Sequence, residues 1–427
     1  MREMKDSGIE WIGQVPNNWE LKKGKYLFKQ HNNRGNLKCL QLLSPSQKFG
    51  VIPQTLLEEL TTQNVVKVSE KANLNDFKTV HVGDFCISLR SFQGGFEYSR
   101  YEGVVSPAYQ IFSAIGDNLC DGYYRYLFKD KSFIDKMNSY TMTLRDGKNI
   151  AFDDFGNTYI PVPPKSEQEK IAGFLDSRCS EIDAISADIQ KEIEILEQYK
   201  RSVITEAVTK GLNPNVEMKD SGVAWCPQIP SNWQYTNPKG LFGLRTDRAF
   251  QNDRQLTASQ EYGIVYQDEY MEKTGNKVVT VTKDFSILKH VEPDDFVISM
   301  RSFQGGLEYS DKRGCISSAY VMLIPNKEFV YAPFYRWFFK SSKYINALQS
   351  TSNLVRDGQA MRYANFVKVP LFIIPIEEQK AIASYLDEKI EKVNSILAEK
   401  KKQLEILSNY KKSLIYEYVT GKKEVLT

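Results

Sequence analysis

Two nearly identical segments, RSFQGGFEYSR and RSFQGGLEYSD, each combine an arginine with a pair of glycines. A guanidinium beside glycine N–H groups can hold an oxyanion such as a phosphate. Arginine and glutamine can also pair with the edge of a nucleobase. The alternative is a turn after a core strand that both segments need only for folding, and the residues leave this open. The candidate binding residues are Arg90, Ser91 and Gln93 in the first segment and Arg301, Ser302 and Gln304 in the second.

A second short motif, RDG, also occurs twice and is followed each time by a polar residue. Such a turn can contact a phosphate, and the alternative is an arginine that pairs with its own aspartate. The candidate residues are Arg145, Lys148, Arg356 and Gln359. Because both copies share RSFQGG and RDG, neither motif can distinguish two different ligand sequences.

The whole chain consists of two copies of one unit. Most motifs recur at an offset of 211 residues, and the openings MKDSGIEWIGQVPNNWE and MKDSGVAWCPQIPSNWQ recur at an offset of 214. This period is far longer than the roughly 20–50 residues of solenoid repeats, so it indicates a duplicated domain pair. Similarity is lost at 29–79 and 243–288, which are rich in Arg, Lys, Asn and Gln.

These diverged regions are where ligand specificity is expected, because their polar side chains can pair with guanine or adenine edges. The alternative is that they form ordinary solvated loops. The candidate base readers are Arg34, Gln47 and Lys48 in the first copy and Arg245, Arg248, Arg254 and Gln260 in the second.

Each copy joins a mixed α/β part to a helical part, so the sequence predicts an α+β fold. Expected strands include VVKVS, FCISL and NKVVTVT, and expected helices cover 123–136 and 333–348. The predicted organisation is a first globular domain at 1–164, a helix at 165–210, a linker at 211–217, a second globular domain at 218–375 and a helix at 376–421.

Apolar residues recur every seven positions in both helical parts, which is typical of a coiled coil. A helix of about 44 residues is about 65 Å long and needs a partner, and the other copy is the simplest one. A pseudo-two-fold axis would make the two helices antiparallel and return the chain near Gly421 to Met4. Lys400 interrupts the pattern, and Lys191, Glu194, Lys200 and Lys402 are expected on outer faces. The predicted seam is Ile182, Ile185, Ile189, Leu196, Tyr199, Val203, Val393, Ile396, Leu404, Leu407, Tyr410 and Leu414.

Composition excludes several classes of protein. The six cysteines form no CxxC and the three histidines are dispersed, so no metal site is predicted, and such cysteines favour a reducing cytoplasm. The longest apolar run, VPLFIIPI, is too short to cross a membrane. P-loop, GxGxxG, HExxH and GxSxG motifs are missing, so no catalytic residue is predicted.

Two similar globular domains, called heads below, would be held at a fixed separation by the helices. This arrangement suits a linear, repetitive ligand, and double-stranded DNA is the natural candidate. The alternative is a non-catalytic coiled-coil adaptor that binds proteins. An adaptor explains the helices and the net charge of only +3, but not two diverged Arg/Gln-rich regions on copied domains.

The duplicated opening, RSFQGG and PPKSEQEKIAGFLD together resemble the specificity subunit of type I restriction–modification systems, over essentially the whole chain. The resemblance implies two target-recognition domains, each reading half of a bipartite DNA site, separated by a coiled coil. It implies double-stranded DNA, two methyltransferase (M) subunits and two restriction/motor (R) subunits as partners. It implies a non-catalytic chain without a cofactor, with S-adenosylmethionine, ATP and Mg used by the partner subunits. The linker TKGLNPNVE lacks the repeated tetrapeptide of some relatives, so a short separation is expected.

Overall fold

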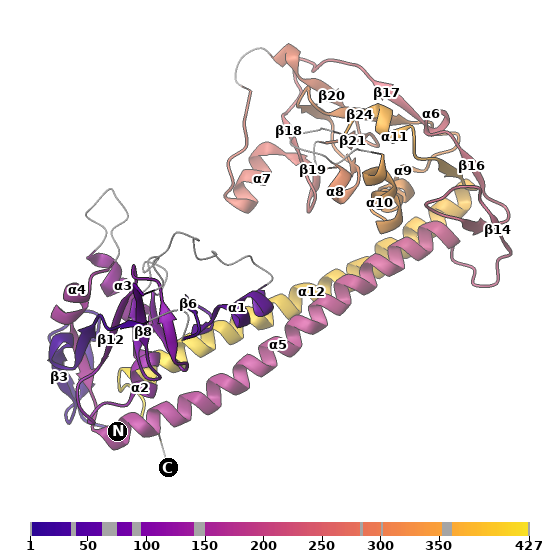
Figure 1. Ribbon diagram of the computed structural model, residues 1–427. Helices are drawn as coiled ribbons and strands as arrows, with labels where there is room; N and C mark the ends of the chain where they lie inside the picture. The colour runs from indigo at the N-terminus through magenta and orange to yellow at the C-terminus, as the bar shows by residue number, and fades with distance from the viewer. Residues whose placement is uncertain are drawn as a thin grey trace. The chain divides into compact units, whose positions relative to one another are not determined.

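The computed structural model describes residues 2–35, 40–61, 75–87, 95–140, 150–281, 285–299, 302–351 and 361–425, with the side chains of Phe303 and Gln304 excepted (Figure 1). The chain divides into two compact units, Met1–Ile189 with Lys402–Thr427, and Gln190–Lys401. Each unit holds one mixed α/β head and a stretch of both long helices, α5 (Lys165–Lys210) and α12 (Ile376–Val419). Because the units divide the chain within these helices, the predicted domain limits stay predictions.

The first head is built around a four-stranded antiparallel sheet in the order β10-β9-β12-β4. These strands are Phe96–Tyr98, Phe85–Ile87, Gln110–Ala114 and Phe28–His31. A second sheet has the order β11 (Gly103–Val105), β8 (Phe77–Val80) and β5 (Arg34–Gly35). Three strand pairs complete it: β1–β2 (Met4–Asp6, Gln14–Pro16), β3–β13 (Glu20–Lys23, Tyr159–Val162) and β6–β7 (Leu43–Ser46, Gly50–Pro53). Its helices are η1 (Gly24–Tyr26), α1 (Gln54–Thr61), α2 (Asp121–Leu127), α3 (Lys131–Ser139) and α4 (Phe152–Asn157).

The second head repeats this plan with the sheet order β17-β24-β21-β22. These strands are Phe242–Arg245, Val321–Pro325, Phe296–Ile298 and Glu308–Tyr309. The strand pairs are β14–β15 (Met218–Asp220, Gln228–Pro230), β16–β25 (Gln234–Thr236, Leu371–Ile373), β18–β19 (Leu256–Ser259, Gly263–Tyr266) and β20–β23 (Lys289–Val291, Gly314–Ile316). Its helices are α6 (Pro238–Leu241), α7 (Gln267–Thr274), η3 (Phe285–Ile287), α8 (Ser302–Gly305), α9 (Ala332–Phe338), α10 (Ser342–Ser350) and α11 (Tyr363–Phe366).

The fold is therefore α+β, as predicted, with three corrections to individual elements. The strand expected in NKVVTVT is not formed in its described part, because residues 276–281 belong to no strand. The helix expected at 123–136 is two helices, because the Asp130 carboxylate accepts from the Ser132 N–H at 2.9 Å and starts a new helix there. The helix expected at 333–348 likewise divides into α9 and α10. FCISL contains β9, whereas VVKVS lies outside the described residues.

Aromatic side chains fill both cores in the same arrangement. In the first head, Phe28 meets Phe85 and Phe112 edge to face with ring centroids 6.0 and 5.6 Å apart. In the second, Phe242 meets Phe296 in the same way at 5.6 Å. Edge-to-face pairs contribute about 0.5–1.5 kcal/mol each beyond their burial. The duplicated sequence thus gives two rigid scaffolds of one design.

The long helices run antiparallel within each unit. In the first unit Phe174 packs on Tyr418, and Asp183 pairs with Lys411 at 2.6 Å. In the second unit, the Lys200 Nζ donates to the Asn394 Oδ1 at 2.7 Å. In both units, residues later in α5 pair with residues earlier in α12, which is the order that antiparallel helices give. Lys400, which interrupts the predicted seam, pairs with Glu192 at 2.5 Å.

One row of the predicted seam needs correction. Ile182, Ile189, Val393 and Leu414 are buried, whereas Ile185 and Ile396 are 50% and 44% exposed and Tyr199 and Tyr410 are also exposed. The second row lies four residues after the first instead of three, at positions such as Ile193 and Leu397, which are buried. Leu196, Val203, Leu404 and Leu407 are half-buried.

Each head is fixed to a helix start through the second tryptophan of its opening motif. Trp19 and Trp233 are fully buried, and their Nε1 atoms donate to Glu167 and Glu378, each at 3.0 Å. In the first head, the C-terminal end of α12 also lies beside Trp19. A Cβ on Gly421 would lie 2.5 Å from Pro16, which pairs with Met4, so the expected return of the chain is confirmed.

Candidate DNA and partner interfaces

Within the second RSFQGG segment, residues 302–305 form the helical turn α8, which packs against α10. The Ser302 hydroxyl accepts from the Ser299 N–H at 2.8 Å and is buried, so Ser302 does not fit the predicted role in ligand contact. Gly306 has a φ of +79°, and a Cβ there would overlap the carbonyl oxygen of Phe339. The glycine pair therefore serves close packing, as the folding alternative expected.

Most other residues of the two repeated motifs lie outside the described residues. Their predicted contacts stay predictions, as does that of Gln304, whose side chain is not described. The residues outside are Arg90, Ser91, Gln93, Arg145, Lys148, Arg301, Arg356 and Gln359.

A buried ion pair follows the RSFQGG segment in each head. Glu97 pairs with Lys129 and Glu308 with Lys340, each at 2.6 Å. Burial raises the pKa of Glu97 to about 7 and also raises the pKa of Glu308, while the lysines oppose the shift. Lys340 also donates to the Gly305 carbonyl at 2.9 Å, so this pair holds the repeated turn in place. These residues were not predicted from the sequence, although both copies carry them at the common offset of 211.

The candidate base readers of the first head are exposed. Arg34 on β5 pairs with Asp76 at 2.6 Å, and both side chains are open to solvent. Gln47 and Lys48 are exposed in the turn between β6 and β7. Exposed ion pairs are weak, about 0–1 kcal/mol, so Arg34 can exchange Asp76 for a base or a phosphate.

In the second head, Arg245 differs from the other candidates because its guanidinium is committed to the protein. Its Nε and Nη2 donate to the Asp295 carboxylate at 2.6 and 3.0 Å, and Nη1 donates to Asp247 at 3.1 Å. The side chain is mostly buried, and the hydrogen bonds that it donates to Asp295 raise the pKa of Arg245. His31 takes the corresponding position in the first head, 3.3 Å from Asp84. The predicted reading role therefore has no support from the geometry of Arg245.

The remaining candidates of the second head lie at its surface. Arg248 is exposed, and its Nη1 donates to the Ile287 carbonyl at 3.2 Å. Arg254 stacks 3.6 Å above the Tyr266 ring and pairs with Asp268 at 2.8 Å. Gln260, in the β18–β19 turn, packs against Gly305, so the diverged hairpin rests directly on the repeated turn.

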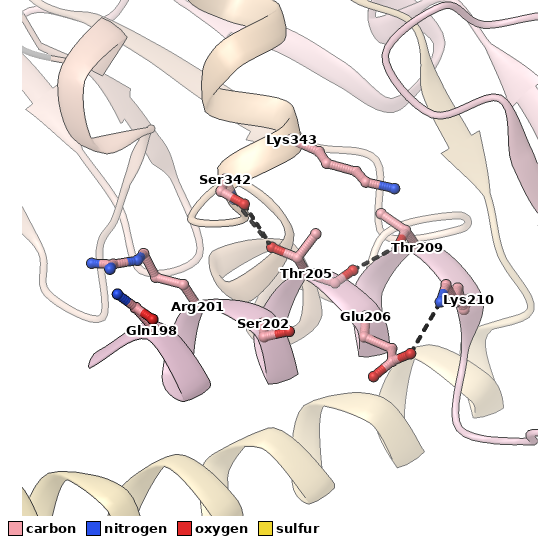
Figure 2. A pocket seen from close by; sticks show the side chains of 9 residues that line it. All are labelled: Gln198, Arg201, Ser202, Thr205, Glu206, Thr209, Lys210, Ser342 and Lys343. Carbon is pink, nitrogen blue, oxygen red and sulfur yellow. Dashed lines mark hydrogen bonds and ion pairs between the residues drawn. The ribbon is translucent and has the colours of Figure 1, made fainter. Parts of the chain in front are cut away.

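A polar groove of about 440 Å³ lies between the last turns of α5 and the start of α10 in the second unit (Figure 2). The Thr205 and Ser342 hydroxyls lie 3.1 Å apart and join the two helices, and Glu206 pairs with Lys210 at 3.0 Å. Arg201 and Lys343 add positive charge to its walls. This groove is a candidate docking surface for a protein partner.

The outer faces of the helices match expectation for three of four residues. Lys191, Glu194 and Lys402 are exposed, whereas Lys200 is half-buried on the seam side, where it bonds Asn394. Among the residues that the structure describes, no helix is long and apolar enough to span a membrane, and no group of three metal-ligand side chains gathers.

Comparison with known proteins decides the family. The model of the type I restriction modification DNA specificity domain matches twice, at residues 16–195 and 230–406. The chain belongs to this family. The two matched regions correspond to the two copies found in the sequence.

Relatives of this specificity family come from Methanocaldococcus jannaschii. The chain is 24% identical to its putative type I restriction enzyme MjaX specificity subunit over 450 residues, covering 97% of this chain and 96% of that one. It is 23% identical to the type I restriction enzyme MjaVIII specificity subunit, covering 64% of this chain and 63% of that one.

A solved chain from work on complex assembly and conformational transition of the type I R-M system shares the fold. Its TM-score is 0.65 at 13% identity, with 96% of this chain and 99% of that chain covered. The predicted resemblance and fold class are thereby confirmed. The family comprises specificity subunits, which are not catalytic by themselves.

Proposed function

We propose that this chain is the DNA-specificity subunit of a type I restriction–modification complex, in which each head reads one half of a bipartite DNA site. The observation that carries the proposal is the double family match on two heads that share one scaffold. The heads differ in exposed basic and amide side chains, such as Arg34 in the first and Arg254 in the second. Side chains of these types recognise guanine and adenine edges.

The helical pair sets the spacing between the half-sites and docks the methyltransferase subunits. The polar groove beside α5 supports docking, because its hydroxyl and charged side chains offer both donors and acceptors. The complex contains two methyltransferase subunits and two restriction/motor subunits. S-adenosylmethionine, ATP and Mg belong to these partners, and this chain needs no cofactor of its own.

The cytoplasm is the compartment where such a complex meets DNA. Free thiols at Cys86, Cys179 and Cys315 agree with a reducing compartment. The adaptor alternative gains no support, because the matching family model describes a DNA specificity domain.

The test is methylation sequencing of DNA from cells that express this chain with its neighbouring methyltransferase subunit. The proposal expects N6-methyladenine at a two-part motif with a fixed gap. Cells that express the methyltransferase subunit alone are the control and should lack the motif. A motif that persists in this control, or the lack of any motif with both subunits present, would contradict the proposal.

A further inference from the structure

The second head carries an extended arm, residues 275–281, which follows α7 (Figure 1). Two glutamine side chains hold its backbone. The Gln255 amide donates to the Val281 carbonyl at 2.7 Å and accepts from the Val281 N–H at 2.9 Å. The Gln267 amide donates to the Val279 carbonyl at 3.4 Å. These bonds replace a strand partner, so the arm is fixed in place without belonging to a sheet.

The arm presents an apolar side chain to solvent. Val279 is 90% exposed, more than any other large apolar residue in the described part of the chain. Val278 and Val281, its neighbours on the arm, are half-buried. Exposed apolar surface is unfavourable by about 25 cal/mol per Å², so a ligand that covers the Val279 side chain would gain this free energy.

The surroundings of Val279 combine apolar and basic groups. A hollow of about 290 Å³ is lined by Val279, Ile287 and Tyr320, among others. Arg248 reaches its edge, since it donates to the Ile287 carbonyl at 3.2 Å. Lys289 donates to the Tyr320 carbonyl at 2.6 Å and adds a second positive charge. An apolar edge flanked by cations fits a base pair and its phosphates better than the surface of an apolar protein.

We infer that Val279, supported by Ile287, contacts the 5-methyl group of a thymine in the second half-site and is a specificity-determining residue. The inference rests on the proposed function. Thymine alone presents a methyl group in the major groove, where cytosine presents only a hydrogen at that position. Gln255 and Gln267 are positioning residues in this account, because they fix the arm that carries Val279.

The experiment removes that methyl group and nothing else. Once the second half-site is known, each of its thymines is replaced in turn by deoxyuridine in a duplex. Binding is then measured with the full chain bound to its methyltransferase subunit. One replacement is expected to weaken binding about fourfold, which corresponds to about 0.8 kcal/mol for one buried methyl-sized group. The Val279→Ala complex is expected to bind the thymine and deoxyuridine duplexes almost equally.

Leu244→Ala is the matched control, because Leu244 is also an exposed apolar residue of the second head but lies on β17. This variant should keep the fourfold preference for thymine. Val279 makes few contacts within the fold, so Val279→Ala should unfold at the wild-type temperature, which a thermal melt verifies.

Three results would overturn the inference while leaving the two-headed reader intact. These are a second half-site made only of G·C pairs, a site in which no thymine responds to deoxyuridine, and a Val279→Ala complex that keeps the full preference. A chain that specifies no bipartite motif would instead overturn the proposed function, and this inference with it.

Discussion

The two heads of this chain have cores of the same design but differ in the strand ends and hairpins around them. Each has the same strand order, an edge-to-face aromatic core and a buried Glu–Lys pair. At the end of the equivalent strands β4 and β17, however, one head has His31 beside Asp84 and the other has Arg245 beside Asp295. The hairpins that follow differ further, with Gln47 and Lys48 in one and Gln260 in the other. Duplication thus kept the groups that position the loops and changed the loops themselves.

The largest effect on stability is expected where the repeated RSFQGG turn packs against the core of the second head. Gly306→Ala introduces a Cβ against the Phe339 carbonyl at a φ of +79°, so the free energy of unfolding of the second head should fall by at least about 4 kcal/mol. Gly275→Ala is the control, because Gly275 has a φ of +69° with no atom within 4 Å of its Cβ, and should cost about 1 kcal/mol. Denaturant unfolding measures both. Equal losses would mean that the turn is not packed as described.

The buried pair in the first head makes its stability depend on pH. The pKa of Glu97 is raised to about 7, above its ordinary value, so the protonated carboxyl is favoured in the folded state. This contribution is fully present below about pH 4.5 and is lost as the pH rises through about 7. Glu97→Gln cannot titrate, so between pH 5 and pH 8 the wild type should lose about 2–3 kcal/mol more stability than the variant does.

Thermal unfolding at pH 5 and pH 8 measures this difference. Glu59→Gln, which changes an exposed carboxylate on α1 of the same head, should keep the wild-type pH dependence. A Glu97→Gln variant that loses as much stability as the wild type between pH 5 and pH 8 would contradict the raised pKa of Glu97.

Substitutions along the helical seam should have a smaller effect on stability. They distinguish the row predicted from sequence from the row that is buried in the structure. Ile193 is buried, whereas Ile185 and Ile195 are exposed. Ile193→Ala should lower the free energy of unfolding by about 2 kcal/mol, the lower end for a buried isoleucine because the seam is only two helices deep. Ile185→Ala and Ile195→Ala should change it by less than about 0.5 kcal/mol. A larger loss for Ile185→Ala would restore the row predicted from sequence.

The smallest effect on stability is expected for a residue that acts only in DNA recognition. Arg254→Ala removes an exposed guanidinium paired with Asp268, so stability should hardly change. Discrimination at one base of the second half-site should fall by about 1–3 kcal/mol if Arg254 reads guanine. Arg245→Ala should do the reverse and destabilise the second head, because it leaves Asp295 buried without its partner. Binding assays on single-base variants of the site, together with melting curves, separate the two outcomes.

The sequence predicted what depends on repetition and missed what depends on distant partners. The duplication and the two long helices follow from motifs that recur at fixed offsets. The second row of the seam was wrong because hydrophobicity favoured Ile185 over Ser186. Seam positions accept polar residues when a partner lies across, as Lys400 shows with Glu192.

The candidate site shows the same limit. Arg245 and Arg254 share their residue type, and each has an aspartate within two residues. Only the fold shows that Arg245 meets Asp295, fifty residues away in the chain, whereas Arg254 meets Asp268 at the surface. Val279 was missed because its segment, NKVVTVT, has the composition of a strand, and only the structure shows an arm held by glutamine side chains.

The most direct test of the two-headed account is a head exchange. Residues 1–164 are replaced by the corresponding domain of another specificity subunit, the chimera is expressed with the methyltransferase subunit, and methylation sequencing identifies the modified motif. The account predicts that one half of the motif changes while the other half and the two-part arrangement persist. A change in both halves, or in neither, would contradict the claim that each head reads its own half-site.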